Sequence, residues 1–394
     1  MKYRCFGRID WKPSALGFGA MRLPVIDHDH GRIDEEEATR MIRHAIDQGV
    51  NYVDTAWGYH RGNSEPFLGR ALGDGYRDRV RLATKLPCWL VEKPEDFDRF
   101  LDEQLRRLQT EHVDFYLLHS LGADSWPKVR DQGVLPWAER AMADGRIGHL
   151  GFSFHDSYEA FQDIVDAYDG WHFCQIQYNY LDVECQAGTR GLQYAAGKGL
   201  AVVIMEPLRG GALAQNIPTS VQALWDSYQP CSGRSPDPRT PADWALQWVW
   251  DQPEVSLVLS GMSTMEQVEE NLASADRSGV GTMSEEELAL VAKVRDAYQA
   301  LCAIPCTGCK YCMPCPSGVN IPEVFEIYND LQMFGDEGRS KQFYAWLDEK
   351  ARAGQCIECG ECLEKCPQHI DIPEWMKKVH EALGQKPGQV PATG

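Results

Sequence analysis

Short apolar runs alternate, over the first 300 residues, with longer segments in which hydrophobic residues recur at helical spacing. Runs of this kind, rich in aliphatic and aromatic residues, are typical of strands buried on both faces of a parallel sheet. The predicted strands are Ala15–Gly19, Tyr52–Asp54, Val80–Lys85, Val113–His119, Ile147–Phe154, Phe173–Tyr178, Leu200–Met205 and Val255–Ser260. The predicted helices are Glu35–Gln48, Pro94–Gln109, Trp126–Asp144, Tyr158–Ala167 and, within a long insertion at residues 206–254, Pro241–Trp250.

Eight strands that alternate with helices predict an α/β fold of the (β/α)8 TIM-barrel type over residues 1–300. An open, doubly wound sheet is the alternative. Such a sheet favours a Gly-x-Gly-x-x-Gly turn after its first strand, and here Gly17-Phe-Gly19-Ala-Met-Arg22 lacks the third glycine. The barrel is therefore the better prediction.

The cysteines separate a second region from the first. Eight of the 14 follow residue 305 in two groups, and each group ends in Cys-Pro. The segment from Cys315 to Glu323 resembles the segment from Cys366 to Glu374, so the region contains an internal repeat, and Asn320 or Asp371 can cap a helix after each group. We predict a small α-helical, dicluster ferredoxin-like domain at 301–383, followed by a disordered tail at 384–394.

The spacing of these cysteines is typical of [4Fe–4S] ligands, because three thiolates come from one turning loop and the Cys before Pro ligates the other cluster. The prediction is two clusters. The first is held by Cys306, Cys309, Cys312 and Cys366, and the second by Cys356, Cys359, Cys362 and Cys315. The first group departs from the ferredoxin pattern, since its last gap is two residues and not three. Zinc is the alternative metal, and Cys302 is an alternative ligand.

Charge and hydropathy narrow the function further. Lys and Arg number 39 and Asp and Glu 58, and this formal net charge of -19 argues against nucleic-acid binding. No run of 18 apolar residues is present, so we expect no membrane span. Residues 1–20 lack an apolar signal region, and cysteines outside a secretory context favour a reducing compartment, so we expect a cytoplasmic protein. The sequence carries no signal for an oligomeric state.

Polar residues fall at or just after the ends of three predicted strands. Asp54, Lys85 and His119 end the second, third and fourth strands, and Tyr59 follows Asp54 by five residues. In a (β/α)8 barrel these strand ends share one rim, where the chemistry takes place. A phenol beside an ammonium that is held by a carboxylate forms a proton-transfer site, because the ammonium stabilises the phenolate.

The segments that carry these residues resemble the aldo-keto reductase superfamily. They are Asp54-Thr-Ala-Trp-Gly-Tyr59, Ala-Thr-Lys85-Leu-Pro and Asp114-Phe-Tyr-Leu-Leu-His119. With the cysteine domain, the chain resembles the bacterial subgroup that carries a C-terminal 4Fe–4S dicluster domain. The resemblance implies that Tyr59 is the general acid for carbonyl reduction, that Lys85 paired to Asp54 lowers its pKa, and that His119 orients the carbonyl oxygen.

The resemblance also implies an extended site for NADPH or NADH across the barrel mouth. Ser153 and Gln177 would bind the carboxamide, Tyr178 would lie near the ring, and the loop Leu208, Arg209, Gly210 would meet the pyrophosphate. The adenosine end would contact Ser260, Gly261, Gln267, Glu270 and Asn271. NADPH-preferring relatives often carry Lys and Arg where this chain has Gly261 and Gln267, which leaves the choice of nucleotide open.

The combined prediction is an oxidoreductase that reduces a carbonyl or an activated small molecule, with two [4Fe–4S] clusters as an electron relay. A redox partner protein would then exchange electrons with the clusters. Two alternatives remain. One is a plain NAD(P)H reductase with structural clusters, and the other is a partner-docking, electron-transfer protein whose barrel senses the nicotinamide.

Overall fold

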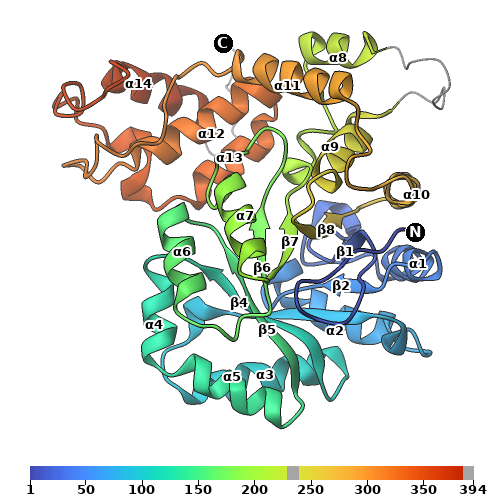
Figure 1. Ribbon diagram of the computed structural model, residues 1–394. Coiled ribbons are helices and arrows are strands. Elements are labelled where there is room, and N and C mark those ends of the chain that lie inside the picture. The colour runs from blue at the N-terminus through green and yellow to red at the C-terminus, as the bar shows by residue number, and fades with distance from the viewer. Residues whose placement is uncertain (229–238, 385–394) are drawn as a thin grey trace. The chain divides into compact units, whose positions relative to one another are not determined.

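The computed structural model describes residues 1–228 and 239–384 of the chain. The tail predicted at 384–394 therefore lies outside the described residues, apart from Gly384. The chain divides into two compact units (Figure 1). The first comprises the described residues of Met1–Leu213 and Pro236–Val291, and the second comprises those of Ala214–Ser235 and Ala292–Gly394.

The first unit is a closed barrel of eight parallel strands in sequence order, as predicted. The strands are β1 Leu16–Gly19, β2 Tyr52–Asp54, β3 Arg81–Leu86, β4 Val113–Leu121, β5 Ile147–Phe154, β6 Phe173–Gln177, β7 Ala201–Met205 and β8 Val255–Gly261. The barrel closes where β1 pairs with β8, with Leu16 opposite Val258 and Gly19 opposite Gly261. Figure 1 shows these strands at the centre of the unit with helices around them.

Helices surround the barrel strands. They are α1 Glu35–Asp47, α2 Ser64–Ala71, α3 Glu95–Leu108, α4 Ser125–Asp131, α5 Val134–Ala143, α6 Tyr158–Asp166, α7 Gly188–Gly197, α9 Pro241–Trp250 and α10 Met265–Asp276. The helix α11, Glu285–Gln299, continues from the first unit into the second. The prediction of one helix over Trp126–Asp144 was wrong, because Gly133 adopts a left-handed conformation with φ of 85° and separates α4 from α5.

Aromatic side chains close the barrel at the amino ends of its strands. The rings of Phe6 and Trp11, from the segment before β1, pack against Tyr52 and Phe115. The Phe115 centroid lies 5.1 Å from that of Phe6 and 5.2 Å from that of Phe173. This end of the barrel is therefore filled core, and functional side chains gather at the opposite end, as is usual for this fold.

The second unit is helical and has a hydrophobic core of its own. Its helices are α8 Thr219–Asp226, α12 Ile321–Phe334, α13 Glu337–Trp346 and α14 Ile372–Leu383. The core includes Val324 and Phe325 of α12 and Met376 and Val379 of α14. At the repeated caps, the Asp371 side chain accepts a hydrogen bond from the Glu374 amide, whereas Asn320 donates to the Glu323 carboxylate and leaves its helix without a side-chain cap. Within the described residues no helix has the length and apolar character to cross a membrane.

Candidate functional site

A buried ion pair connects the carboxyl ends of β2 and β3. Lys85 is 1% exposed, and its Nζ donates to Asp54 Oδ1 at 2.6 Å and to the Thr55 carbonyl at 2.8 Å. The same Nζ lies 3.3 Å from the phenol oxygen of Tyr59, on the short turn Tyr59–Gly62 that follows β2. The structure thus brings together three of the four residues predicted from the strand ends.

The fourth residue, His119, lies beside this group. Its ring centroid is 6.1 Å from that of Tyr59 and 5.1 Å from that of Trp89, a half-exposed residue after β3. Among the described residues, the buried His119 Nδ1 and Asp54 Oδ2 atoms have no hydrogen-bond partner. An unsatisfied ring nitrogen beside a phenol is an arrangement that a polar substrate atom would complete.

Burial and charge set the protonation states of the group. Burial is the largest influence on the pKa of Lys85 and lowers it, but Asp54 and Tyr59 together outweigh burial and raise the pKa above its ordinary value, so Lys85 stays an ammonium. Burial raises the pKa of Tyr59, and the Lys85 ammonium opposes this increase only in part. Burial, followed by the charge of Lys85, holds the pKa of His119 well below its ordinary value. The resting site therefore contains a protonated phenol, an ammonium and a neutral imidazole.

Two of the residues predicted to hold a nicotinamide carboxamide already have partners within the chain. The Ser153 hydroxyl, on β5, accepts a hydrogen bond from the Ser120 amide at 2.8 Å. The Gln177 amide donates to Asp182 at 3.0 Å and accepts from Gln186 at 3.1 Å. A bound carboxamide would have to share or exchange these hydrogen bonds.

Tyr178 faces the helix layer outside the barrel. It follows Gln177 directly, and successive side chains on a strand point to opposite faces. Its ring lies 5.3 Å from that of Trp248 on α9, and its hydroxyl is 3.0 Å from the Thr189 hydroxyl on α7. Tyr178 thus contributes to packing between the strands and the helices.

The loop after β7 contains a cation that is already neutralised. Arg209 lies between Leu208 and Gly210 on a short turn, and its Nε donates to Asp182 Oδ2 at 3.0 Å with both side chains about nine-tenths buried. The same carboxylate oxygen accepts from Asn179 and Gln177. Asp182 is therefore the centre of a polar network that the sequence analysis did not identify, because no motif in the sequence marks this position.

The predicted adenosine-binding residues lie at the end of β8 and on α10. The Asn271 amide donates to the Ser260 hydroxyl at 3.0 Å, and both are buried. The Gln267 side chain accepts from the Ser263 amide at 2.8 Å. Glu270 accepts a hydrogen bond from the Thr240 hydroxyl at the start of α9. Gly261, at the carboxyl end of β8, is exposed. The side chain of Arg22 packs against it, and a Cβ added to Gly261 would lie 3.1 Å from the Arg22 Cβ.

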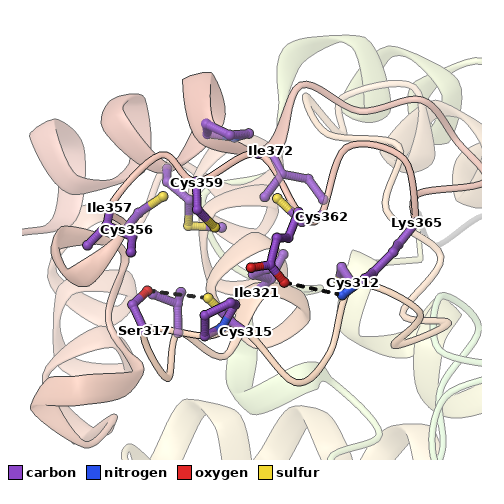
Figure 2. Close-up of a pocket in the computed structure, with 16 residues that line it drawn as sticks. Cys312, Cys315, Ser317, Ile321, Cys356, Ile357, Cys359, Cys362, Lys365 and Ile372 are labelled. Carbon is purple, nitrogen blue, oxygen red and sulfur yellow. Dashed lines mark hydrogen bonds and ion pairs between the residues drawn. The ribbon is translucent and has the colours of Figure 1, made fainter.

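The cysteines of the second unit line two cavities. One is lined by Cys306, Cys309, Cys312 and Cys366, and the other, which Cys312 also borders, is lined by Cys315, Cys356, Cys359 and Cys362. Figure 2 shows Cys356, Cys359 and Cys362 lying across from Cys315 in the second cavity. These two sets are the ligand sets predicted from the spacing, including the exchange of the Cys-Pro cysteine between the groups.

The donor set of both cavities fits an iron–sulfur cluster, since thiolates are its usual ligands and Ile321 and Ile372 form apolar walls of both. Among the described residues, no three His, Cys, Asp or Glu side chains are grouped closely enough to hold a single metal ion. The alternative ligand Cys302 borders neither cavity, and its sulfur lies 3.5 Å from that of Met333.

Two sequence families match this chain. The model described as "Aldo/keto reductase family" matches residues 15–295, and that described as "4Fe-4S dicluster domain" matches residues 305–370. Among named relatives, L-galactose dehydrogenase of Arabidopsis thaliana is 25% identical over 76% of this chain and 96% of its own. NADH-specific methylglyoxal reductase of Escherichia coli is 25% identical over 76% of this chain and 100% of its own.

Solved structures show the same barrel. The holo form of aldo-keto reductase AKR11C1 from Bacillus halodurans matches with a TM-score of 0.60 and 25% identity, over 75% of this chain and 96% of that chain. An aldo-keto reductase from Klebsiella pneumoniae in complex with NADPH matches with a TM-score of 0.59 and 26% identity, over 75% and 96% of the two chains.

Proposed function

The chain belongs to the aldo/keto reductase family and carries a 4Fe-4S dicluster domain, and from this premise we propose that it reduces a carbonyl or an activated small molecule with Tyr59 as the proton donor. The observation that carries the proposal is the position of Lys85 Nζ, which contacts both Asp54 Oδ1 and the Tyr59 phenol. As the phenol gives up its proton, the ammonium stabilises the developing phenolate. The ion pair with Asp54 keeps that ammonium charged.

His119 would orient the substrate in this proposal. Its imidazole is neutral, and its Nδ1 has no partner among the described residues, so the ring can offer a hydrogen bond to a carbonyl oxygen without adding a second positive charge. Trp89, whose ring lies 5.1 Å from that of His119, would cover the site from the solvent side. Holding the carbonyl between a proton donor and a hydride donor supplies a large part of the rate in reactions of this kind.

The hydride donor in the proposal is NADPH or NADH, bound across the barrel mouth between the Leu208–Gly210 loop and the Ser260–Asn271 segment. The Klebsiella pneumoniae relative has been solved with NADPH, and the Escherichia coli relative is named as NADH-specific. Ser153 and Gln177 would hold the carboxamide.

We propose further that residues 301–383 hold two [4Fe–4S] clusters, one in each four-cysteine cavity, and that these relay electrons between the barrel and a redox partner protein. Bound clusters of this type exchange one electron at a time. Eight thiolates need a reducing compartment, so we place the protein in the cytoplasm. The simpler alternative is that the clusters stabilise the second unit and transfer no electrons.

Replacement of the proton donor tests the reductase proposal. Tyr59→Phe removes the phenol and keeps the ring, and it should reduce turnover about 10²- to 10⁴-fold while nicotinamide binding is retained. Tyr194→Phe is the matched control, because that hydroxyl donates to the surface residue Asp166, outside the candidate site, and turnover should not change. Full activity of Tyr59→Phe would contradict the proposal.

The relay is tested by anaerobic purification, by iron and sulfide analysis, and by titration with NADH and NADPH while the visible cluster absorption is recorded. About eight irons per chain, with bleaching by a nicotinamide nucleotide, would support electron exchange between barrel and clusters. About eight irons without bleaching, together with carbonyl-dependent oxidation of the nucleotide, would favour the plain reductase.

A further inference from the structure

Lys85 is held through its backbone as well as through its side chain. The Nε2 atom of Gln104, a buried residue of α3, donates to the Lys85 carbonyl at 3.0 Å. At the other end of the residue, the Lys85 Nζ contacts Asp54 and the Tyr59 phenol. A helix of the layer around the barrel therefore contacts the backbone of the residue whose side chain reaches the phenol.

Gln104 is itself held in one orientation by buried polar groups. Its Nε2 also donates to the Glu65 carboxylate at 2.6 Å and lies 3.1 Å from the Thr84 hydroxyl. Its Oε1 accepts a hydrogen bond from the Tyr116 hydroxyl at 2.7 Å. A carboxylate and a backbone carbonyl only accept, so the nitrogen of the amide must face Glu65 and Lys85.

The same network reaches the chain on both sides of Tyr59. Glu65 lies in the first turn of α2, shortly after Tyr59, and its second carboxylate oxygen accepts from Arg107 at 3.2 Å. The guanidinium carbon of Arg107 lies 3.7 Å from the ring centroid of Trp57, which precedes Tyr59. One group of buried polar contacts thus connects β3, which carries Lys85, with the segments before and after the phenol.

We propose that Gln104 is a positioning residue, which holds the backbone of Lys85 so that its ammonium meets the Tyr59 phenol. The inference rests on the proposed function and deepens it, because it assigns a residue that acts through Lys85 and touches neither substrate nor nucleotide. The contact from Lys85 Nζ to Tyr59 is 3.3 Å, whereas that to Asp54 is 2.6 Å. A small displacement of Lys85 would therefore weaken the contact with the phenol first.

The barrel contains a matched glutamine away from the site. Gln247 of α9 is also buried, and its Nε2 donates to the Ser274 carbonyl at 2.8 Å and to the Asp243 carboxylate at 3.1 Å. Each of the two glutamines thus donates to one backbone carbonyl and to one buried carboxylate that is paired with an arginine. Replacement of either by methionine removes the same kinds of hydrogen bond, but of the two only Gln104 contacts Lys85.

Turnover tests the proposal, with methylglyoxal and benzaldehyde as the carbonyl probes and NADPH or NADH as the hydride donor. Gln104→Met should lower kcat about 10- to 100-fold and leave KM within about twofold, since misplacement of a catalytic group by about 1 Å has an effect of this size. Gln247→Met should leave kcat at the wild-type value. Equal losses of kcat in the two variants would overturn the inference.

The pH dependence of turnover is the readout that a merely structural role would not move. Burial raises the pKa of Tyr59 and the Lys85 ammonium opposes this increase, so withdrawal of the ammonium should raise the pKa further. Reduction needs the protonated phenol and is lost as pH rises through this pKa. The alkaline loss of kcat should therefore move to higher pH in Gln104→Met and stay in place in Gln247→Met.

Tyr116→Phe is a milder variant, for the case that Gln104→Met does not fold. It keeps the ring and removes the one hydroxyl that donates to Gln104 Oε1. We expect kcat to fall about 3- to 10-fold, with the alkaline loss again at higher pH, because the amide is no longer fixed in its orientation. Wild-type kcat and an unchanged pH profile in this variant would contradict the positioning role.

A measurement without turnover separates this inference from the proposed function. Chemical denaturation gives the loss in the free energy of unfolding that Gln104→Met causes in the wild type and in the Asp54→Asn/Lys85→Met background, which has no ammonium to position. The loss should be smaller in that background, and equal losses would overturn the inference. Unequal losses in a chain that reduces neither probe with either nucleotide would contradict the proposed function and leave the positioning of Lys85 by Gln104 standing.

Discussion

At the scale of single residues, the buried Asp54–Lys85 pair has a large energetic consequence. Both side chains are at most 4% exposed, and they are joined at 2.6 Å. Removal of one partner from a buried ion pair leaves the other charge without compensation, which typically costs about 3–5 kcal/mol. We expect Lys85→Met to lower the free energy of unfolding of the barrel by about that amount, as measured by chemical denaturation followed through tryptophan fluorescence.

The double variant Asp54→Asn/Lys85→Met separates charge from packing. A neutral amide beside a methionine carries no uncompensated charge, so we expect the double variant to be more stable than Lys85→Met alone. A double variant whose loss equals the sum of the two single losses would show that the two side chains stabilise the barrel independently, against this view of the site.

The residues of this site were predictable to different degrees, and the reason is topological. Asp54, Lys85 and His119 end predicted strands, and parallel strands of one barrel must bring their ends to one rim. No motif in the sequence marks Gln104 or Asp182, because their contacts depend on how helices and loops pack around the closed barrel. The hydrogen bond from Gln104 to the Lys85 carbonyl joins α3 to β3, and helical spacing alone does not show that a polar residue of α3 faces the strands.

At the scale of elements, Gly133 decides where α4 ends and α5 begins. Its φ of 85° is accessible to glycine at little cost, and an ideal Cβ added there meets nothing within 4 Å. Gly133→Ala would therefore be penalised by backbone conformation alone and not by a steric clash. We expect a loss of about 1–2 kcal/mol in the free energy of unfolding, measured by chemical denaturation.

Gly197, the last residue of α7, is the matched control. It also has open space around its Cβ position, but its φ is not positive. Gly197→Ala should leave stability unchanged or raise it by up to about 1 kcal/mol, because alanine restricts the unfolded chain and favours the helix. Equal effects of the two substitutions would show that the conformation of Gly133 does not set the helix boundary.

The strength of the hydrophobic pattern explains which elements could be predicted from the sequence. All eight strands follow from their apolar runs, and α1, α3, α6 and α9 follow from helical spacing that matches their observed bounds closely. The helix α7, with the sequence Gly-Thr-Arg-Gly-Leu-Gln-Tyr-Ala-Ala-Gly, was not identified, because three glycines and few large apolar residues weaken its pattern. Packing of its buried residues Leu192 and Ala195 between neighbouring elements stabilises this helix instead.

At the scale of the whole molecule, the two units differ in what stabilises them. The barrel unit has an extensive apolar core between strands and helices, whereas the core of the second unit is built from α12, α13, α14 and short connecting segments. Six of the cysteines that line the two cavities belong to or pack against this small core, and each cavity is lined by cysteines from both loops. A metal that binds the folded domain adds its binding free energy to the stability of that domain.

The second unit should therefore depend on the proposed clusters for stability, and the barrel should not. Cys366→Ser removes the one thiol that the second loop contributes to the first cavity. On the proposal of one cluster in each cavity, we expect iron to fall from about eight to about four per chain, with Cys315→Ser acting in the same way on the second cavity. Cys302 borders neither cavity, so the Cys302→Ser variant should retain all of the iron. In anaerobic scanning calorimetry, either ligand variant should lower the melting temperature of the second unit, because metal binding is coupled to folding there, while the barrel transition stays in place. Loss of iron without a shift in either transition would contradict the view that the proposed clusters stabilise the second unit.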